Sequence, residues 1–337
     1  FAVLEPYHQL FAMAVNRFVY VTIQKSDKYR LTLKNFNLQN LKWRFLENGQ
    51  VHIDGDDKRA RFVKEAISVV GQFLRENNYP VEPFSMTIDS DLDDRSGRKY
   101  GLGSSAAVVT ATVTAILKLF YIKEPPPELI FKLAAIAHIQ TQGNGSGADV
   151  AASTYGGVVQ YASFQAEWLK NELDHTKRLS DLVEKNWTYL SIQPVDFPKN
   201  ARLCIGWTGN PASTYNLVEE VSLLKVKNPS QYQQFLSDSK LAVDFILKGM
   251  NNNNLELFLE GIKQNRQCLS LLGENAETEI ETPLLKSLCD IAESFGGAAK
   301  PSGAGGGDCG IAFIPAQHDH VIEQLRQAWI QAGITPL

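Results

Sequence analysis

The sequence predicts an α+β fold divided into two domains. The chain has 337 residues, and at about 150 residues per domain this length favours two folded units. Helical spacing and strand-like composition alternate along it without a strict strand–helix–strand rhythm, which favours α+β over a doubly wound sheet. The pattern breaks at Asp196-Phe197-Pro198-Lys199-Asn200, so we expect domains at 1–198 and 199–337.

The first domain is expected to contain three strands and three helices. Strands are predicted at 18–23, 84–89 and 157–161, which are rich in β-branched and aromatic residues. Helices are predicted at 61–75, 104–120 and from 128 to about 140, where apolar residues recur at helical spacing. The proline run Pro125-Pro126-Pro127 separates the last two helices.

The second domain is expected to be mainly helical with two strands. A strand at 202–207 begins it, and helices follow near 240–250, 255–272, 283–295 and 320–332. The asparagine run 251–254 forms the turn between the first two of these helices. A second strand at 310–314 lies between the last two helices.

Composition excludes several broad classes. Hydrophobic residues make up 44% and charged residues 21%, which is typical of a globular protein and excludes disorder as the main character. The net charge of −4 gives no footprint for nonspecific nucleic-acid binding, and no apolar run reaches the ~18 residues of a membrane span. Four scattered cysteines without a CxxC pair predict reduced thiols in a cytoplasmic protein, and no secretory leader is visible.

The most informative stretch joins a strand to a helix through small residues. Its candidate phosphate-binding residues are Lys99, Gly101, Leu102, Gly103, Ser104, Ser105, Ala106 and Ala107. Two glycines let the backbone approach a ligand, and the free N–H groups of the following helix point at it. The serine hydroxyls suit a phosphate or Mg²⁺. The alternative is a tight turn with a serine N-cap, which needs one glycine and one serine.

Two better-known phosphate loops are excluded at this stretch. The pattern G-x-x-x-x-G-K-[ST] of a P-loop is absent from the whole chain. The pair Gly101-x-Gly103 is followed by Ala106 and lacks the later acidic partner of a dinucleotide fingerprint.

A second cluster, residues 142–149, places three glycines and a carboxylate close together. Asp149 closes this stretch, and an aspartate beside small residues can hydrogen-bond a substrate and take its proton during phosphoryl transfer. The alternative role for Asp149 is the N-cap of the next short helix.

A third cluster, residues 300–310, contains five glycines among eleven residues. It is expected to link helix 283–295 directly to strand 310–314. Because glycine density carries a large entropic cost, we expect this loop to lie against another domain or a phosphate. Cys309 has no matching histidine motif, so we expect a buried small residue rather than a nucleophile.

Taken together, the stretches GLGSSAA, GNGSGADVAAS and SGAGGGDCG resemble, in this order, the three motifs of the GHMP small-molecule kinases. The resemblance covers nearly the whole chain. It implies an N-terminal domain like domain 2 of ribosomal protein S5 and a ferredoxin-like C-terminal domain.

Within that superfamily the chain is most similar to bacterial phosphomevalonate kinases. The charged loop between Thr87 and Gly103 and the stretch from Ile205 to Ser213 resemble that branch. Mevalonate kinases carry a metal-binding glutamate eleven residues before the catalytic aspartate, and His138 stands at that place here.

The resemblance also implies roles for individual residues. Gly101 to Ala107 would hold the ATP phosphates, Ser105 or Ser104 would hold Mg²⁺ (Ser105 preferred), and Asp149 would act on the acceptor. Residues beside the acceptor or covering the site would be Asn144, Ser146, Gly147, Ser213, Ser302, Gly303, Ala304, Gly305 and Gly306.

One departure concerns the family's first motif, which places a lysine on the opening strand. That lysine is absent, because the chain begins with Phe1 just after the corresponding position. We expect the natural start to lie upstream; an impaired copy is the alternative.

The resulting hypothesis is ATP-dependent phosphorylation of (R)-5-phosphomevalonate to the diphosphate in the mevalonate pathway of isoprenoid biosynthesis. Its partners are ATP, Mg²⁺ and the small acceptor, without nucleic acid or membrane, in a monomer or homodimer. Lys99, Arg98 and Arg266 are candidate cations for the acceptor's phosphate. The alternatives are a mevalonate kinase, a diphosphomevalonate decarboxylase, and a non-catalytic protein of the same fold.

Overall fold

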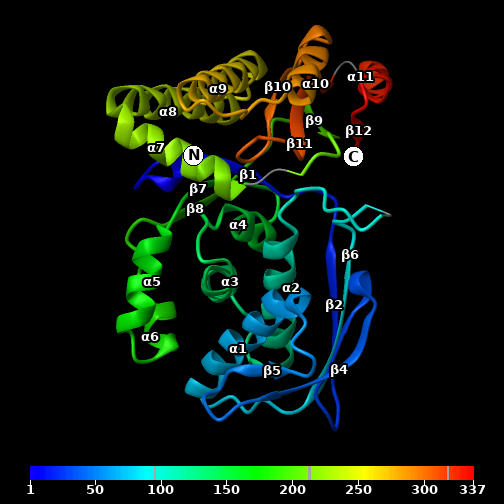
Figure 1. Ribbon diagram of the computed structural model, residues 1–337, viewed down its shortest axis with the longest axis vertical. Coiled ribbons are helices and arrows are strands. Elements are labelled where there is room, and N and C mark those ends of the chain that lie inside the picture. Colours follow the sequence, from blue (N-terminus) through cyan, green and yellow to red (C-terminus); the bar gives the residue numbers. More distant parts are fainter. Residues whose placement is uncertain (95, 212–213, 317–318) are drawn as a thin grey trace.

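The computed structural model describes residues 1–94, 96–211, 214–316 and 319–337. A mixed five-stranded sheet forms one wall of the N-terminal half (Figure 1). In spatial order its strands are β2 (Val19–Lys25), β6 (Phe84–Ser90), β3 (Arg30–Leu33), β4 (Leu38–Phe45) and β5 (Val51–Ile53). The pair β3–β6 is parallel and the other neighbours are antiparallel.

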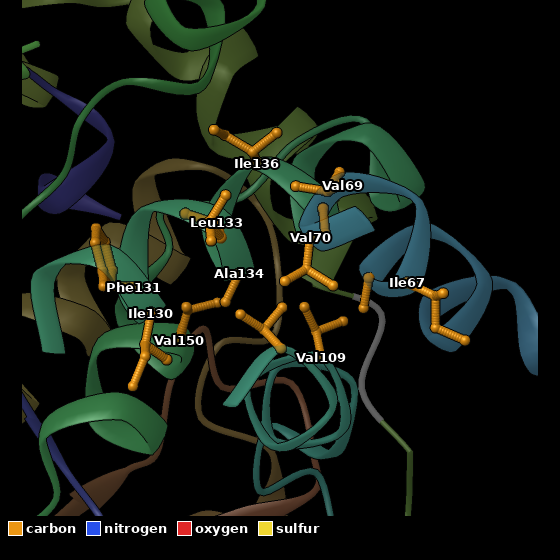
Figure 2. Close-up of a cluster of buried hydrophobic side chains, with 14 of the residues drawn as sticks. Ile67, Val69, Val70, Val109, Ile130, Phe131, Leu133, Ala134, Ile136 and Val150 are labelled. Atoms are coloured by element: carbon orange, nitrogen blue, oxygen red, sulfur yellow. The ribbon is translucent and has the colours of Figure 1, made fainter. Parts of the chain in front are cut away.

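Helices pack against this sheet and bury one large apolar core. They are α1 (Arg61–Glu76), α2 (Ser104–Phe120), α3 (Pro127–Gln142) and α4 (Ala148–Tyr155), with α5 (Ala166–His175) and α6 (Leu179–Glu184) beside them. Figure 2 shows side chains of this core, including Val70 from α1, Val109 from α2 and Leu133 from α3. Helix α3 is buried almost all round, as a central helix must be when others surround it.

A second, smaller sheet lies between the two halves of the molecule (Figure 1). Its antiparallel strands are β1 (Gln9–Met13), β7 (Val158–Ala162) and β8 (Ser191–Val195), in that order. In the described part of the N-terminal half, short 3-10 helices lie at Ala2–Leu4, Lys34–Phe36 and Lys58–Ala60.

The C-terminal half contains an antiparallel four-stranded sheet. Its spatial order is β10 (Ala298–Pro301), β11 (Cys309–Pro315), β9 (Ala201–Trp207) and β12 (Thr335–Pro336). When these four strands are numbered in chain order and read from the β12 edge, the spatial order is 4-1-3-2. This order confirms the expected ferredoxin-like arrangement. The helices are α7 (Thr214–Lys227), α8 (Pro229–Asn251), α9 (Leu255–Asn275), α10 (Pro283–Ser294) and α11 (Asp319–Gln331).

The predicted elements are present, and several others were not predicted. Helix α2 has the predicted bounds, whereas α8 begins at Pro229 rather than near residue 240. The expectation that the third glycine cluster joins a helix directly to a strand is wrong. Strand β10 intervenes, so the cluster is the loop of a hairpin between β10 and β11.

The predicted boundary at residue 198 falls between β8, in the middle sheet, and β9, in the C-terminal sheet. It stays a prediction, because the first residues also contact the C-terminal half: Ala2 packs in one apolar cluster with Val221 and Leu224 of α7. Among the described helices, none is both long and apolar enough to cross a membrane.

Candidate active site

A cleft of about 1510 Å³ lies where the two halves meet, and parts of all three glycine clusters line it. Of the predicted residues, those lining the cleft are Gly101, Leu102, Gly103, Ala107, Asn144, Ser146, Asp149, Ser302, Gly303, Ala304 and Gly305. Clusters that lie far apart in the sequence therefore share one site.

The first cluster is a tight loop between two acidic side chains. Gly101 and Gly103 have φ of 76° and 75°, a backbone region that other residues adopt only with strain. A Cβ atom at Gly101 would overlap the Asp308 carboxyl group, and one at Gly103 would lie 3.1 Å from Cγ of Asp149. Gly103 is also the N-cap of the 17-residue helix α2, so free N–H groups and the positive helix end face this loop.

The two serines at the start of α2 do not line the cleft. Ser105 Oγ lies 3.1 Å from Nε2 of His138, the residue at the place of the glutamate of mevalonate kinases. Burial lowers the pKa of His138 to about 4, so the ring is neutral at physiological pH. Either tautomer leaves a lone pair on the Ser105 oxygen.

Hydrogen bonds to one carbonyl oxygen hold the second cluster in place. The Ser146 carbonyl accepts from the Tyr161 hydroxyl at 2.5 Å and from the Ser163 hydroxyl at 2.9 Å. A Cβ atom at Gly147 would come within 2.5 Å of the Phe164 ring and 2.8 Å of the Tyr161 hydroxyl, so only glycine fits there. Tyr161 and Ser163 are supporting residues that the sequence analysis missed.

Asp149 is a helical residue and not a helix cap. Gly147 is the N-cap of α4 and Asp149 lies in its first turn, which excludes the N-cap alternative. Within the described chain its carboxyl group has no hydrogen-bond or ion-pair partner. The side chain is exposed to the cleft, and desolvation by the protein atoms around it raises the pKa of its carboxyl group.

The third cluster is fixed to its own domain at one end and open to the cleft at the other. Gly306 N–H donates to the Ile280 carbonyl at 2.8 Å, and Gly305 has no room for a side chain against that same carbonyl. Gly303, by contrast, has open space around its α-carbon. Ser302 to Gly305 line the cleft, whereas Gly306 packs against Leu217.

Several predicted residues lie elsewhere. Lys99 is exposed and forms an isolated antiparallel β-bridge with Asp93 through its backbone. Ala106 is buried in the core, and neither residue lines the cleft. Ser213 lies outside the described residues. Arg98 is bound to Asp94 near the cleft rather than lining it.

Arg266, one of the three candidate cations for the acceptor's phosphate, is paired with carboxylates outside the cleft. Its guanidinium bonds to Glu281 at 2.7 Å, Asp290 at 2.6 Å and Glu293 at 2.9 Å, and it does not line the cleft. The carboxylates around it raise its pKa despite its burial, so its charge is already neutralised locally.

Other cations occupy the cleft instead. Arg17, Arg61, Lys118 and Lys300 all line it. Lys300 Nζ donates to the Pro301 carbonyl at 2.6 Å, and burial lowers its pKa to about 8. Lys300 is the first residue of the third cluster, but no local sequence pattern marks it as a cleft residue. No group of three or more metal-binding side chains is found among the described residues.

Comparison with known proteins identifies the family. A model of the GHMP kinases N-terminal domain matches residues 61–157, and the model of the C-terminal domain matches residues 246–331. A phosphomevalonate kinase of Streptomyces sp. (strain CL190) is 34% identical over 349 residues, which span 100% of this chain and 92% of that protein.

Solved structures agree with this family and its two-domain fold. The Lin0012 protein of Listeria innocua superposes with a TM-score of 0.93 at 37% identity, over 100% of this chain and 92% of that one. The phosphomevalonate kinase of Streptococcus pneumoniae, solved with phosphomevalonate and AMPPNP, gives a TM-score of 0.85 at 28% identity, over 100% and 94%. With three glycine clusters lining one cleft and a relative 34% identical over 92% of its own length, this chain belongs to the GHMP kinase family.

Proposed function

We propose that this chain transfers the γ-phosphoryl group of ATP to (R)-5-phosphomevalonate, giving the diphosphate and ADP. The observation that carries the proposal is the meeting of the three clusters: Gly103 lies against Asp149 and Gly101 against Asp308, in one cleft. The choice of acceptor is supported by the similarity to the Streptomyces phosphomevalonate kinase and to the Streptococcus enzyme, which was solved with phosphomevalonate bound.

The chemistry assigned to the protein is positioning and charge stabilisation. Backbone N–H groups at the start of α2 hold the ATP phosphates, with the helix dipole behind them. Asp149 contacts the acceptor and takes the remaining proton of its phosphate when that phosphate is monoanionic. Asn144, Ser146 and the loop Ser302 to Gly305 enclose the acceptor from two sides.

The residues present suit Mg²⁺. In the cleft, Asp149 supplies a carboxylate that no described protein group pairs with, and such hard oxygen donors, together with substrate phosphates, are the usual ligands of this ion. Ser105 and Ser104 stay candidate ligands as hydroxyl groups at the start of α2, although neither lines the cleft. When bound, the ion would neutralise charge on the phosphates being transferred.

The acceptor's negative charges require cations within the cleft. Lys300, Arg17 and Arg61 line it and replace Arg266 in this role. The chain's four described cysteines are free thiols, which supports a reducing, cytoplasmic location. We propose a monomer or homodimer that binds only small molecules.

A coupled assay of ADP release with phosphomevalonate, mevalonate and diphosphomevalonate in parallel tests the acceptor. We expect turnover with phosphomevalonate alone. Turnover of mevalonate alone would identify a mevalonate kinase instead. ATP binding without ADP release from any acceptor would favour the non-catalytic alternative.

A further inference from the structure

The first glycine cluster is attached to the C-terminal sheet by contacts that the roles above do not explain. Trp207, at the end of β9, meets the Tyr100 ring edge-to-face, with centroids 5.2 Å apart and planes at 85°. The Arg98 guanidinium lies 5.0 Å from the centre of the Trp207 ring. We call Arg98, Tyr100, Trp207 and Cys309 the junction.

Cys309 completes the junction from the neighbouring strand. It pairs with Trp207 across β9 and β11, so the two side chains come from the same end of one sheet. Its thiol donates to the Tyr100 carbonyl at 3.1 Å. Burial raises the pKa of Cys309 to about 12, so the group stays a thiol and keeps its hydrogen.

These contacts act on the backbone immediately before the phosphate loop. The Tyr100 carbonyl that Cys309 holds belongs to the peptide that leads into Gly101, and Gly101 itself lies against Asp308. The loop belongs to the N-terminal half, but the partners that fix its first residues come from the C-terminal half. Trp207 is itself buried, so its ring is a firm support for Tyr100.

We propose that Trp207 is a positioning residue for the nucleotide: through Tyr100 and Arg98 it sets the place of the Gly101–Gly103 loop from the opposite domain. The inference rests on the proposed function of this loop as the ATP-phosphate site. The C-terminal domain would then have two roles: the loop Ser302 to Gly305 covers the cleft, and Trp207 positions the loop that binds the nucleotide.

The test compares Trp207→Leu with Trp207→Phe in binding of AMPPNP with Mg²⁺, measured by calorimetry. Aromatic and cation–π contacts of this kind support about a tenfold loss of affinity in the leucine variant. We expect phenylalanine, which keeps a ring edge for Tyr100, to restore most of it. The acceptor's KM should stay within about twofold.

Trp329→Leu is the matched control, because Trp329 is fully buried in the same domain and donates its indole N–H to the Leu288 carbonyl, away from the junction. It should lower the melting temperature and leave AMPPNP affinity unchanged. If Trp207→Leu does not fold, Tyr100→Leu removes the same contact from the other side and should show the same loss.

Unchanged AMPPNP affinity in Trp207→Leu, or in Tyr100→Leu where that variant replaces it, would overturn the inference. An equal loss in Trp329→Leu would do the same, by showing that any damage to this domain is sufficient. A wild-type chain that binds no nucleotide would refute the proposed function itself, which separates the two failures.

Discussion

At the scale of single residues, Asp149 stands out because it is acidic, enclosed by the cleft and unpartnered in the described chain. Desolvation without a protein cation to compensate it disfavours the charged form of this carboxyl group and raises its pKa. Proteins retain such groups at sites where a ligand completes them. The sequence left its role open between acceptor contact and helix cap, and the backbone position of Gly147 decided against the cap.

We expect Asp149→Asn to lower kcat by two to four orders of magnitude, the usual contribution of a proton-transferring group. The amide has the same size, so the melting temperature should hold or rise. Steady-state ADP release and thermal unfolding check both parts. A kcat near that of the wild type would remove Asp149 from the mechanism.

Lys300 shows how a residue useful for binding can weaken the fold. Its pKa is lowered to about 8 from an ordinary 10.5, so below pH 8 the folded chain carries a buried charge that the unfolded chain exposes to water. Above pH 10.5 the lysine is neutral in both states, so this cost is absent. As the pH falls from 10.5 to 8, the unfolded chain takes up the proton and the folded chain does not, so the free energy of unfolding decreases.

Lys300→Met should therefore stabilise the protein at pH 7, by at most about 3.5 kcal/mol at ~1.4 kcal/mol per pKa unit. It should also abolish the rise in wild-type stability between pH 8 and 10.5. Denaturant unfolding at pH 7 and pH 10 measures both effects. The same variant should bind the acceptor less well, and a variant no more stable than wild type at pH 7 would contradict the argument.

At the scale of elements, periodicity predicted the helices that pack on one face and failed where the pattern is irregular. Strand β4 was missed because its burial does not alternate, and Asn40 within it adopts a positive φ of 51° that interrupts the pleat. The first half of α8 carried a usable signal, with Tyr232, Phe235 and Leu236 at helical spacing behind Pro229 at its start.

The site was predictable only as far as local backbone chemistry reached. The three glycine clusters are recognisable from their composition, and their order, which resembles that of the three GHMP kinase motifs, suggested that they meet in one site. Arg17 and Lys300 become cleft residues only through tertiary packing, so no local pattern distinguishes them from solvated surface charges. Sequence reasoning also could not show that Arg266 is already paired, because its three acidic partners are up to 27 positions away in the chain.

Helices α8 and α9 approach each other closely through glycine. A Cβ atom at Gly261 would lie 2.7 Å from Ile246 Cγ1 and 3.0 Å from the Ala242 carbonyl oxygen. Alanine is ordinarily better than glycine in a helix by about 1 kcal/mol, so propensity alone predicts stabilisation by Gly261→Ala.

We expect the opposite, a loss of about 1–3 kcal/mol, because the backbone on the facing side cannot move aside without separating the helices. Equilibrium unfolding in denaturant measures it. A stabilised Gly261→Ala variant would mean that the two helices can separate at little cost.

At the scale of the whole molecule, the cleft joins the two halves, so a ligand bound there should stabilise both. AMPPNP with Mg²⁺ at 100 times its Kd should add about 2.7 kcal/mol to the free energy of unfolding. Calorimetric melting should then shift as a single transition. A shift confined to part of the unfolding enthalpy would show that the nucleotide contacts one half alone.

The N-terminal residues and the junction also constrain how the chain can be synthesised and folded. Ala2 packs with residues of α7, and the Tyr100 carbonyl accepts a hydrogen bond from the Cys309 thiol, so both segments depend on partners that are synthesised after them. The five-stranded sheet and its helices can assemble during translation, whereas the phosphate loop acquires its lasting shape only after the final hairpin emerges. A nascent chain is therefore expected to gain nucleotide affinity only after the β10–β11 hairpin has been synthesised.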